Sequence, residues 1–128
     1  SLPGLGAAIH SLMRGDSAQA TGVLAQVAES LPDEGGGADA LALAGRVALG
    51  QHQFELAERL LLRSIERDVD GPSAATAQFE LAKVYIAIGR RTDAANRLEG
   101  VILNYPMSAV VPSARRLLDR VTQAIPAS

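Results

Sequence analysis

The sequence predicts an all-α protein: a right-handed α-solenoid of three helical hairpins closed by a C-terminal capping helix. The first observation is a period of 37 residues, at which Ala8, Gly45 and Ala82 recur. The other columns that keep this interval are Gly15, His52 and Gly89; Ala20, Ala57 and Ala94; Leu24, Leu61 and Leu98; and Pro32, Val69 and Pro106. Such a period is typical of stacked supersecondary units. The second observation is composition, because strong helix formers dominate and β-branched residues form no alternating run.

The first copy, about residues 1–34, begins weakly. Pro3, Gly4 and Gly6 disfavour a helix before about Ala7, whereas the segment from Ser17 to Ser30 favours a second helix. The glycine-rich segment 34–37 then forms a flexible connection to the second copy.

The second copy, about residues 38–71, has two clearer helical stretches. Asp39 to Leu49 is expected to form the first helix, residues 50–52 the turn, and Phe54 to Arg67 the second helix. Residues 70–72, with Gly71 and Pro72, are typical of a turn into the next copy.

The third copy, about residues 75–108, is the most regular. Ser73 to Ile88 carries apolar residues at three- and four-residue spacing, which predicts a helix. Gly89 can adopt the left-handed conformation that ends it. The second helix is expected to begin at Thr92 and Asp93 and to stop before Pro106, because proline cannot continue a helix.

A capping helix is expected from about Ala109 to Ala124. The period fails here, since Asp119 stands 37 residues after Ala82, where a small residue would be needed. Arg115, Arg116 and Arg120 give this helix a polar face, which suits the end of a stack. We therefore expect seven helices in one domain, residues 1–128, that is part of a longer protein.

Composition and charge narrow the classes of function. The chain lacks cysteine, so disulfides and thiolate metal sites are excluded. No apolar stretch reaches the roughly 18–20 residues that span a bilayer, so this segment is not expected to insert into a membrane. Residues 1–70 carry a net charge of −5 and residues 71–128 a net charge of +3. This polarity indicates either ordinary solvated helix faces or attraction between opposite ends, towards another copy or an acidic partner.

Residue patterns for chemistry are missing from the sequence. His10 and His52 have no neighbouring ligand pattern, and Asp33 and Glu34 lie in a glycine-rich loop that is too mobile for acid–base catalysis. Residues 35–37 are not followed by the Lys and Ser or Thr of a phosphate loop. An acidic pI near 5.6 and 3% aromatic residues disfavour nucleic-acid binding. We expect no catalytic residue, no metal site, no cofactor and no enzyme activity.

The third copy matches a known repeat pattern most fully, through Ala82, Tyr85, Gly89, Ala94, Leu98 and Pro106. The first copy has Ser11 in place of the aromatic residue. The second copy has Ala48, His52 and Val69 in place of the aromatic residue, the glycine and the proline. This pattern resembles the tetratricopeptide repeat (TPR) family, whose usual unit is about 34 residues. The resemblance covers about residues 2–108 and implies a scaffold or adaptor for protein–protein interaction.

The resemblance also implies a concave groove lined by the first helix of each hairpin. The matching positions are Leu5, Ile9 and Leu12; Ala42, Arg46 and Leu49; and Phe79, Lys83 and Ile86. Such a trough could hold a peptide or a helix of a partner, with apolar anchors and with Arg46 and Lys83 binding an acidic group. Alternatively, several of the apolar residues pack between neighbouring helices.

The third copy closes with the sequence Asn104-Tyr105-Pro106-Met107-Ser108, followed by Pro112. This ending is similar to that of bacterial cell-envelope TPR proteins, such as the Tol–Pal coordinator and the outer-membrane assembly lipoprotein. The likeness implies a periplasmic or envelope location in preference to the cytoplasm. Two alternatives stay open: a structural subunit or oligomerisation module, and a cytoplasmic regulatory domain of a larger protein.

Overall fold

A computed structural model describes residues 22–23, 26, 30 and 36–124 of the chain. Within this part all regular structure is helical, so the all-α prediction is confirmed. The helices are α3 (Gly37–Gly50), α4 (Phe54–Arg67), α5 (Ala74–Ala87), α6 (Arg91–Asn104) and α7 (Val111–Ala124). Of the first copy only residues 22–23, 26 and 30 are described, so its predicted first helix lies outside the described residues.

The helices have equal lengths, and equivalent helices start at a constant interval along the chain. Each contains 14 residues, and α3, α5 and α7 begin at residues 37, 74 and 111, which are 37 residues apart. The helices α4 and α6 begin at residues 54 and 91, again 37 residues apart. The helix α7 therefore occupies the place of a first helix in a fourth copy. The period that fails at Asp119 as a residue pattern continues as a helix register.

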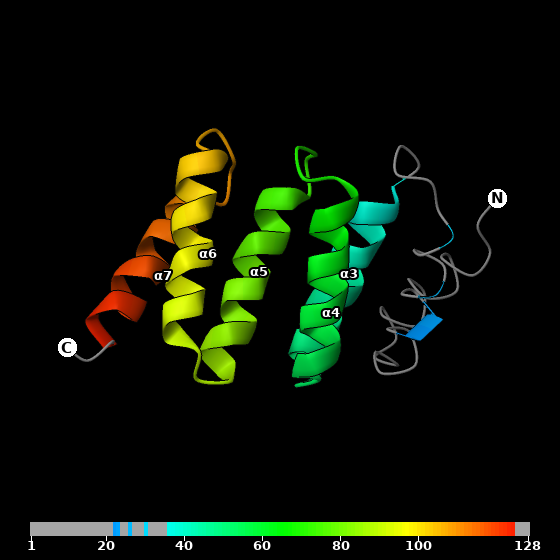
Figure 1. The fold of residues 1–128 in the computed structure, drawn as a ribbon, viewed down its shortest axis with the longest axis horizontal. Helices are drawn as coiled ribbons and strands as arrows, with labels where there is room; N and C mark the ends of the chain where they lie inside the picture. Colours follow the sequence, from blue (N-terminus) through cyan, green and yellow to red (C-terminus); the bar gives the residue numbers. More distant parts are fainter. Residues whose placement is uncertain (1–21, 24–25, 27–29, 31–35, 125–128) are drawn as a thin grey trace.

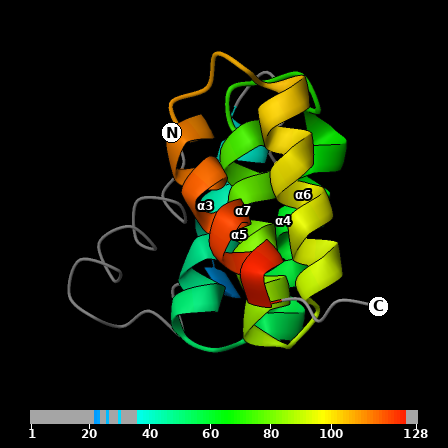
Figure 2. The same cartoon turned by 90° about the vertical axis from the view of Figure 1, so that its left-hand side faces the viewer.

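The helices form two rows. Each helix contacts the next along the chain, and α3 also contacts α5. In Figure 1, α4 and α6 lie in front of α3 and α7, with α5 between them. Figure 2, which looks along the molecule from the C-terminal end, shows α6 on one side and α7 on the other. The helices α3, α5 and α7 thus make one side of the molecule, and α4 and α6 make the other.

The turns inside the hairpins share one geometry. Beyond α5, Gly89 has a φ of 83°, its N–H donates to the Ile86 carbonyl (3.1 Å), and the Arg90 N–H donates to the Tyr85 carbonyl (2.7 Å). These two bonds form a Schellman motif, which satisfies carbonyls that a helix end leaves free. Beyond α3, His52 takes the same place with a φ of 60°, and the His52 and Gln53 N–H groups donate to Leu49 and Ala48. His52 and Gly89, one period apart in the repeat column, are therefore both turn residues, and Gly15 of the same column lies outside the described residues.

The core explains the columns of small and bulky residues. Leu61 and Leu98, one period apart, are fully buried, and so are Ala57 and Ala94. A Cβ added at Gly45 would lie 2.6 Å from Leu61 Cγ, closer than two carbon atoms can approach. The glycine therefore lets α4 lie directly against α3, as expected from the small residues of the repeat.

The helix α7 buries one face and leaves the other polar. Val111, Ala114 and Val121 are buried at intervals of three and seven residues, which place them on one face of the helix. Gly45 of α3 and Ala82 of α5 are buried where each helix meets the second helix of its hairpin, but the equivalent Asp119 is exposed. Arg115 and Thr122 are exposed on the same face as Asp119, so this face of α7 is polar.

Candidate partner-binding groove

The predicted groove residues occupy different environments. Leu5, Ile9 and Leu12 lie outside the described residues. Ala42 is 5% exposed and belongs to the core, so it packs between helices rather than lining a surface. Arg46 is exposed, and the residues that are half-buried are Leu49, Phe79, Lys83 and Ile86.

Three of the predicted residues line one cavity. It has a volume of about 460 Å³, lies where α3 meets α5, and is referred to below as the α3–α5 cavity. Its lining residues are Leu43, Arg46, Val47, Leu49, Gly50, Glu80 and Lys83. The fold thus brings Arg46, Leu49 and Lys83 together, whereas Ala42, Phe79 and Ile86 are not among its lining residues.

The position of the two cations follows from the helix register. Arg46 stands ten residues into α3 and Lys83 ten residues into α5. Because these helices are equivalent and touch each other, equal positions on them come side by side. Leu43 and Leu49, three residues before and after Arg46, lie on the same helix face as Arg46, and Val47 completes the apolar part of the wall.

Glu80 is a cavity residue that sequence reasoning missed. It is 7% exposed, and its Oε2 lies 3.0 Å from Nζ of Lys83, one helical turn further along α5. The Lys83 ammonium also lies 5.0 Å from the centre of the Phe79 ring, within range of a cation–π contact. The i, i+3 spacing of Glu80 and Lys83 was visible in the sequence, but the burial of the carboxylate depends on the packing of α5 in the fold.

Arg120 is a second residue that sequence reasoning did not assign to the groove side. It lies 37 residues after Lys83, and α7 has the register of a first helix, so Arg46, Lys83 and Arg120 hold equivalent positions on α3, α5 and α7. The 37-residue period could have identified Arg120 from the sequence, but the residue pattern of the period ends at Asp119. The side formed by α3, α5 and α7 thus carries a cation at the same place in each helix.

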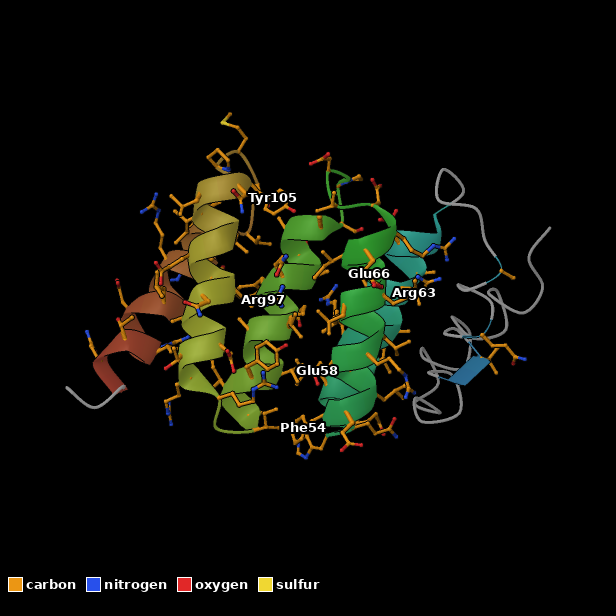
Figure 3. The ribbon with its side chains drawn as sticks, viewed as in Figure 1. Phe54, Glu58, Arg63, Glu66, Arg97 and Tyr105 are labelled. Carbon is orange, nitrogen blue, oxygen red and sulfur yellow. The ribbon has the colours of Figure 1, made fainter. Side chains whose placement is uncertain are left out.

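The opposite side holds a polar cluster with a structural role. Tyr85 donates a hydrogen bond from its hydroxyl to Glu58 Oε2 (2.8 Å), and the Arg90 guanidinium stacks on the Tyr85 ring at 4.4 Å. Arg90 also contacts Glu58 (3.5 Å) and Asp93 (2.8 Å). Figure 3 shows Glu58 on α4 and Arg97 on α6, on either side of α5. Burial, and next the bond to Glu58, raise the pKa of Tyr85 above its ordinary value.

The Tyr-Pro ending of the third copy links two loops. The Tyr105 hydroxyl donates to the Val69 carbonyl (2.6 Å), which joins the loop after α6 to the loop after α4. The residue one period before Tyr105 is Asp68, next to Val69, so the bond connects corresponding loops of neighbouring copies. Burial, and next the Asp70 charge, raise the pKa of Tyr105.

Metal ligands and membrane spans can be judged for the described residues. No group of three or more His, Asp or Glu side chains among them could hold a metal ion. His52 stacks on Phe54 with ring centres 5.7 Å apart, and His10 lies outside the described part. None of the helices described has both the length and the apolar character needed to cross a membrane.

The chain was compared with protein-family models and with curated proteins. No protein-family model matches the chain, and a search of the curated proteins found no match.

Proposed function

We propose that this chain is a protein–protein interaction module without enzyme activity, a right-handed α-solenoid of TPR-like hairpins with α7 as its cap. The constant 37-residue spacing of α3, α5 and α7 and of α4 and α6 supports this proposal. So do the common turn geometry and the small residues that let each hairpin close. Modules built in this way present an extended surface to other molecules.

The partner segment, a peptide or a helix, binds on the side formed by α3, α5 and α7. The observation that carries this proposal is the α3–α5 cavity, where the apolar Leu43, Val47 and Leu49 adjoin the exposed cation of Arg46. A mixed wall of this kind suits an amphipathic segment, because apolar anchors give affinity and the cation fixes a carboxylate. No cofactor is required for such binding.

The experiment is a titration of a fluorescein-labelled peptide of alternating leucine and glutamate, followed by fluorescence anisotropy. Replacing Arg46 and Lys83 by Glu should weaken binding by about tenfold or more, the change expected when charge pairs across an interface become repulsive. Arg59→Glu combined with Arg91→Glu, at two exposed arginines on α4 and α6, is the matched control because it changes the net charge by the same amount on the other row. Unchanged binding after the replacement of Arg46 and Lys83, or equal weakening by the control, would rule out the groove.

A bacterial envelope assembly is the proposed setting of this interaction. Its support is the Tyr-Pro-x-Ser ending, in which the Tyr105 hydroxyl ties neighbouring copies together. The sequence of the parent gene upstream of Ser1 tests the proposal. A lipoprotein signal or a transmembrane segment there would support an envelope location, whereas a cytoplasmic catalytic domain would favour a regulatory module of a larger protein.

A second candidate function is a structural subunit or an oligomerisation module. It is favoured by Leu103 and Met107, which are 75% and 95% exposed at the end of α6 and in the following loop. Large apolar side chains in such positions suit a permanent interface. Light scattering at low and high salt separates the two candidates. A monomer throughout excludes self-assembly, an oligomer that persists at high salt supports the apolar interface, and an oligomer that dissociates with salt indicates charge-driven contacts.

A further inference from the structure

Among the lining residues of the α3–α5 cavity, Glu80 is the acidic one, and it is almost fully buried. The exposed fraction of its side chain is 9%, compared with 41% for the side chain of Lys83. A buried carboxylate requires a charged or hydrogen-bonding partner. Lys83 provides that partner at 3.0 Å, within the cavity where a ligand would bind.

Arg46 differs from Lys83 in its surroundings. The Lys83 ammonium is held by the Glu80 carboxylate and the Phe79 ring, whereas no ion pair joins Arg46 to another described residue. The charges of Glu80 and Lys83 cancel, so the positive charge left on the cavity wall is that of Arg46. An arginine side chain can bind a carboxylate through two parallel hydrogen bonds.

We propose that Glu80 is an internal carboxylate ligand of Lys83, so that the groove binds an acidic partner segment through Arg46 and selects one carboxylate flanked by apolar side chains. This inference rests on the proposed function of the groove. A partner carboxylate that bound Lys83 and broke its ion pair with Glu80 would leave Glu80 charged, buried and unpaired, which is strongly unfavourable. A carboxylate that shared Lys83 would instead approach Glu80 and be repelled by it.

The experiment compares two fluorescein-labelled peptides of equal length by anisotropy. One alternates leucine and glutamate, and the other keeps a single central glutamate with glutamine in the remaining places. The wild-type chain should bind both with Kd values within about threefold of each other. Glu80→Gln should tighten binding of the alternating peptide by about tenfold, the gain from one further charge-assisted contact, and leave the single-glutamate peptide within about threefold.

Two variants make the result specific. Glu99→Gln removes an exposed carboxylate from α6 and should change neither affinity beyond about threefold, which controls for net charge. Lys83→Met added to Glu80→Gln should abolish the gain, because the freed ammonium is its source. Circular dichroism and thermal melting confirm that each variant is folded.

Several outcomes would overturn the inference: a Glu80→Gln chain with unchanged preference, a gain that survives Lys83→Met, or tighter wild-type binding of a leucine–lysine peptide. In the last case Glu80 itself would be the partner-binding charge.

Arg46→Glu in the same series distinguishes the two proposals. If it weakens both peptides while Glu80→Gln changes neither, the groove stands and the role of Glu80 is wrong. If the peptides do not bind, or Arg46→Glu has no effect, the proposed function fails and the inference fails with it.

Discussion

At the scale of single residues, close approach between helices decides which side chains are tolerated. Gly45 of α3 packs against the side chain of Leu61 of α4, and even a methyl group at residue 45 would overlap that side chain. Gly100 of α6 is different, because a Cβ added to it would meet only Asn104 Nδ2 at 3.8 Å, an ordinary contact. Two helical glycines therefore have opposite consequences when they are replaced.

We predict that Gly45→Ala lowers the free energy of unfolding by about 1–2 kcal/mol. Overpacking a core costs about 1–3 kcal/mol, and the better helix propensity of alanine offsets at most about 1 kcal/mol. Gly100→Ala, the matched control, should raise the same free energy by about 0.5–1 kcal/mol. Urea denaturation of both variants measures the difference. Equal effects would show that α3 and α4 are not in contact at Gly45.

The two tyrosines give a pH prediction at the same scale. Burial raises the pKa of both Tyr85 and Tyr105, so the folded chain keeps the phenolic protons to higher pH than the unfolded chain does. Their contribution to stability is therefore complete below about pH 10, the ordinary tyrosine pKa, and is lost as pH rises through the folded pKa values.

Tyrosinate absorbance measures this titration cleanly, because the chain has two tyrosines and no tryptophan. We expect the folded chain to titrate above the unfolded chain, and Tyr85→Phe to leave the Tyr105 transition alone. A folded chain that titrates together with the unfolded one would contradict the burial and hydrogen bonding of both hydroxyl groups.

At the scale of elements, the left-handed turn residue fixes the geometry of each hairpin. Gly89 has a φ of 83°, a conformation that costs a residue with a Cβ about 1–2 kcal/mol. We predict that Gly89→Ala lowers the free energy of unfolding by about this amount. Gly50→Ala is the control, because Gly50 has no positive φ and its Cβ would lie in open space. Thermal melting of the two variants checks the prediction, and an unchanged Gly89→Ala melting temperature would refute it.

The sequence predicted the helices well because local residues set their limits. The observed α4 has the predicted limits, Phe54 and Arg67, and α5 differs from its prediction by one residue at each end. The observed α7 begins at Val111 rather than about Ala109, since the Ser108 side chain accepts a hydrogen bond from the Val110 N–H in the preceding turn. Such a side-chain contact competes with helix formation and is hard to read from a pattern.

The groove was harder to predict, because burial there depends on contacts between helices. The resemblance to the repeat family picked out Arg46, Leu49 and Lys83, and these three residues line one cavity in the structure. The resemblance could not show that Ala42 is covered, because its burial depends on packing in the folded chain. Nor could it show that Glu80 is buried beside Lys83, since an i, i+3 pair is usually exposed.

At the scale of the whole molecule, α7 shows why a residue period and a structural period can separate. The 37-residue interval between first helices is kept up to α7, which begins at Val111. The face of α7 that is equivalent to the hairpin contact of α3 and α5 is polar, as at Asp119. Arg120 nevertheless keeps the place of Arg46 and Lys83. The molecule thus pairs one side lined by equivalent cations with a terminal helix suited to solvent.

The central claim is that a partner segment binds between α3 and α5, and photo-crosslinking tests it directly. The chain has no cysteine, so single-cysteine variants can carry a benzophenone label at chosen sites. Gly50→Cys places the label at the α3–α5 cavity, and Glu99→Cys places it on exposed α6. We predict that the leucine–glutamate peptide crosslinks at residue 50 and not at residue 99, and that Arg46→Glu abolishes the crosslink. Equal crosslinking at both sites, or a crosslink that persists in Arg46→Glu, would contradict the account.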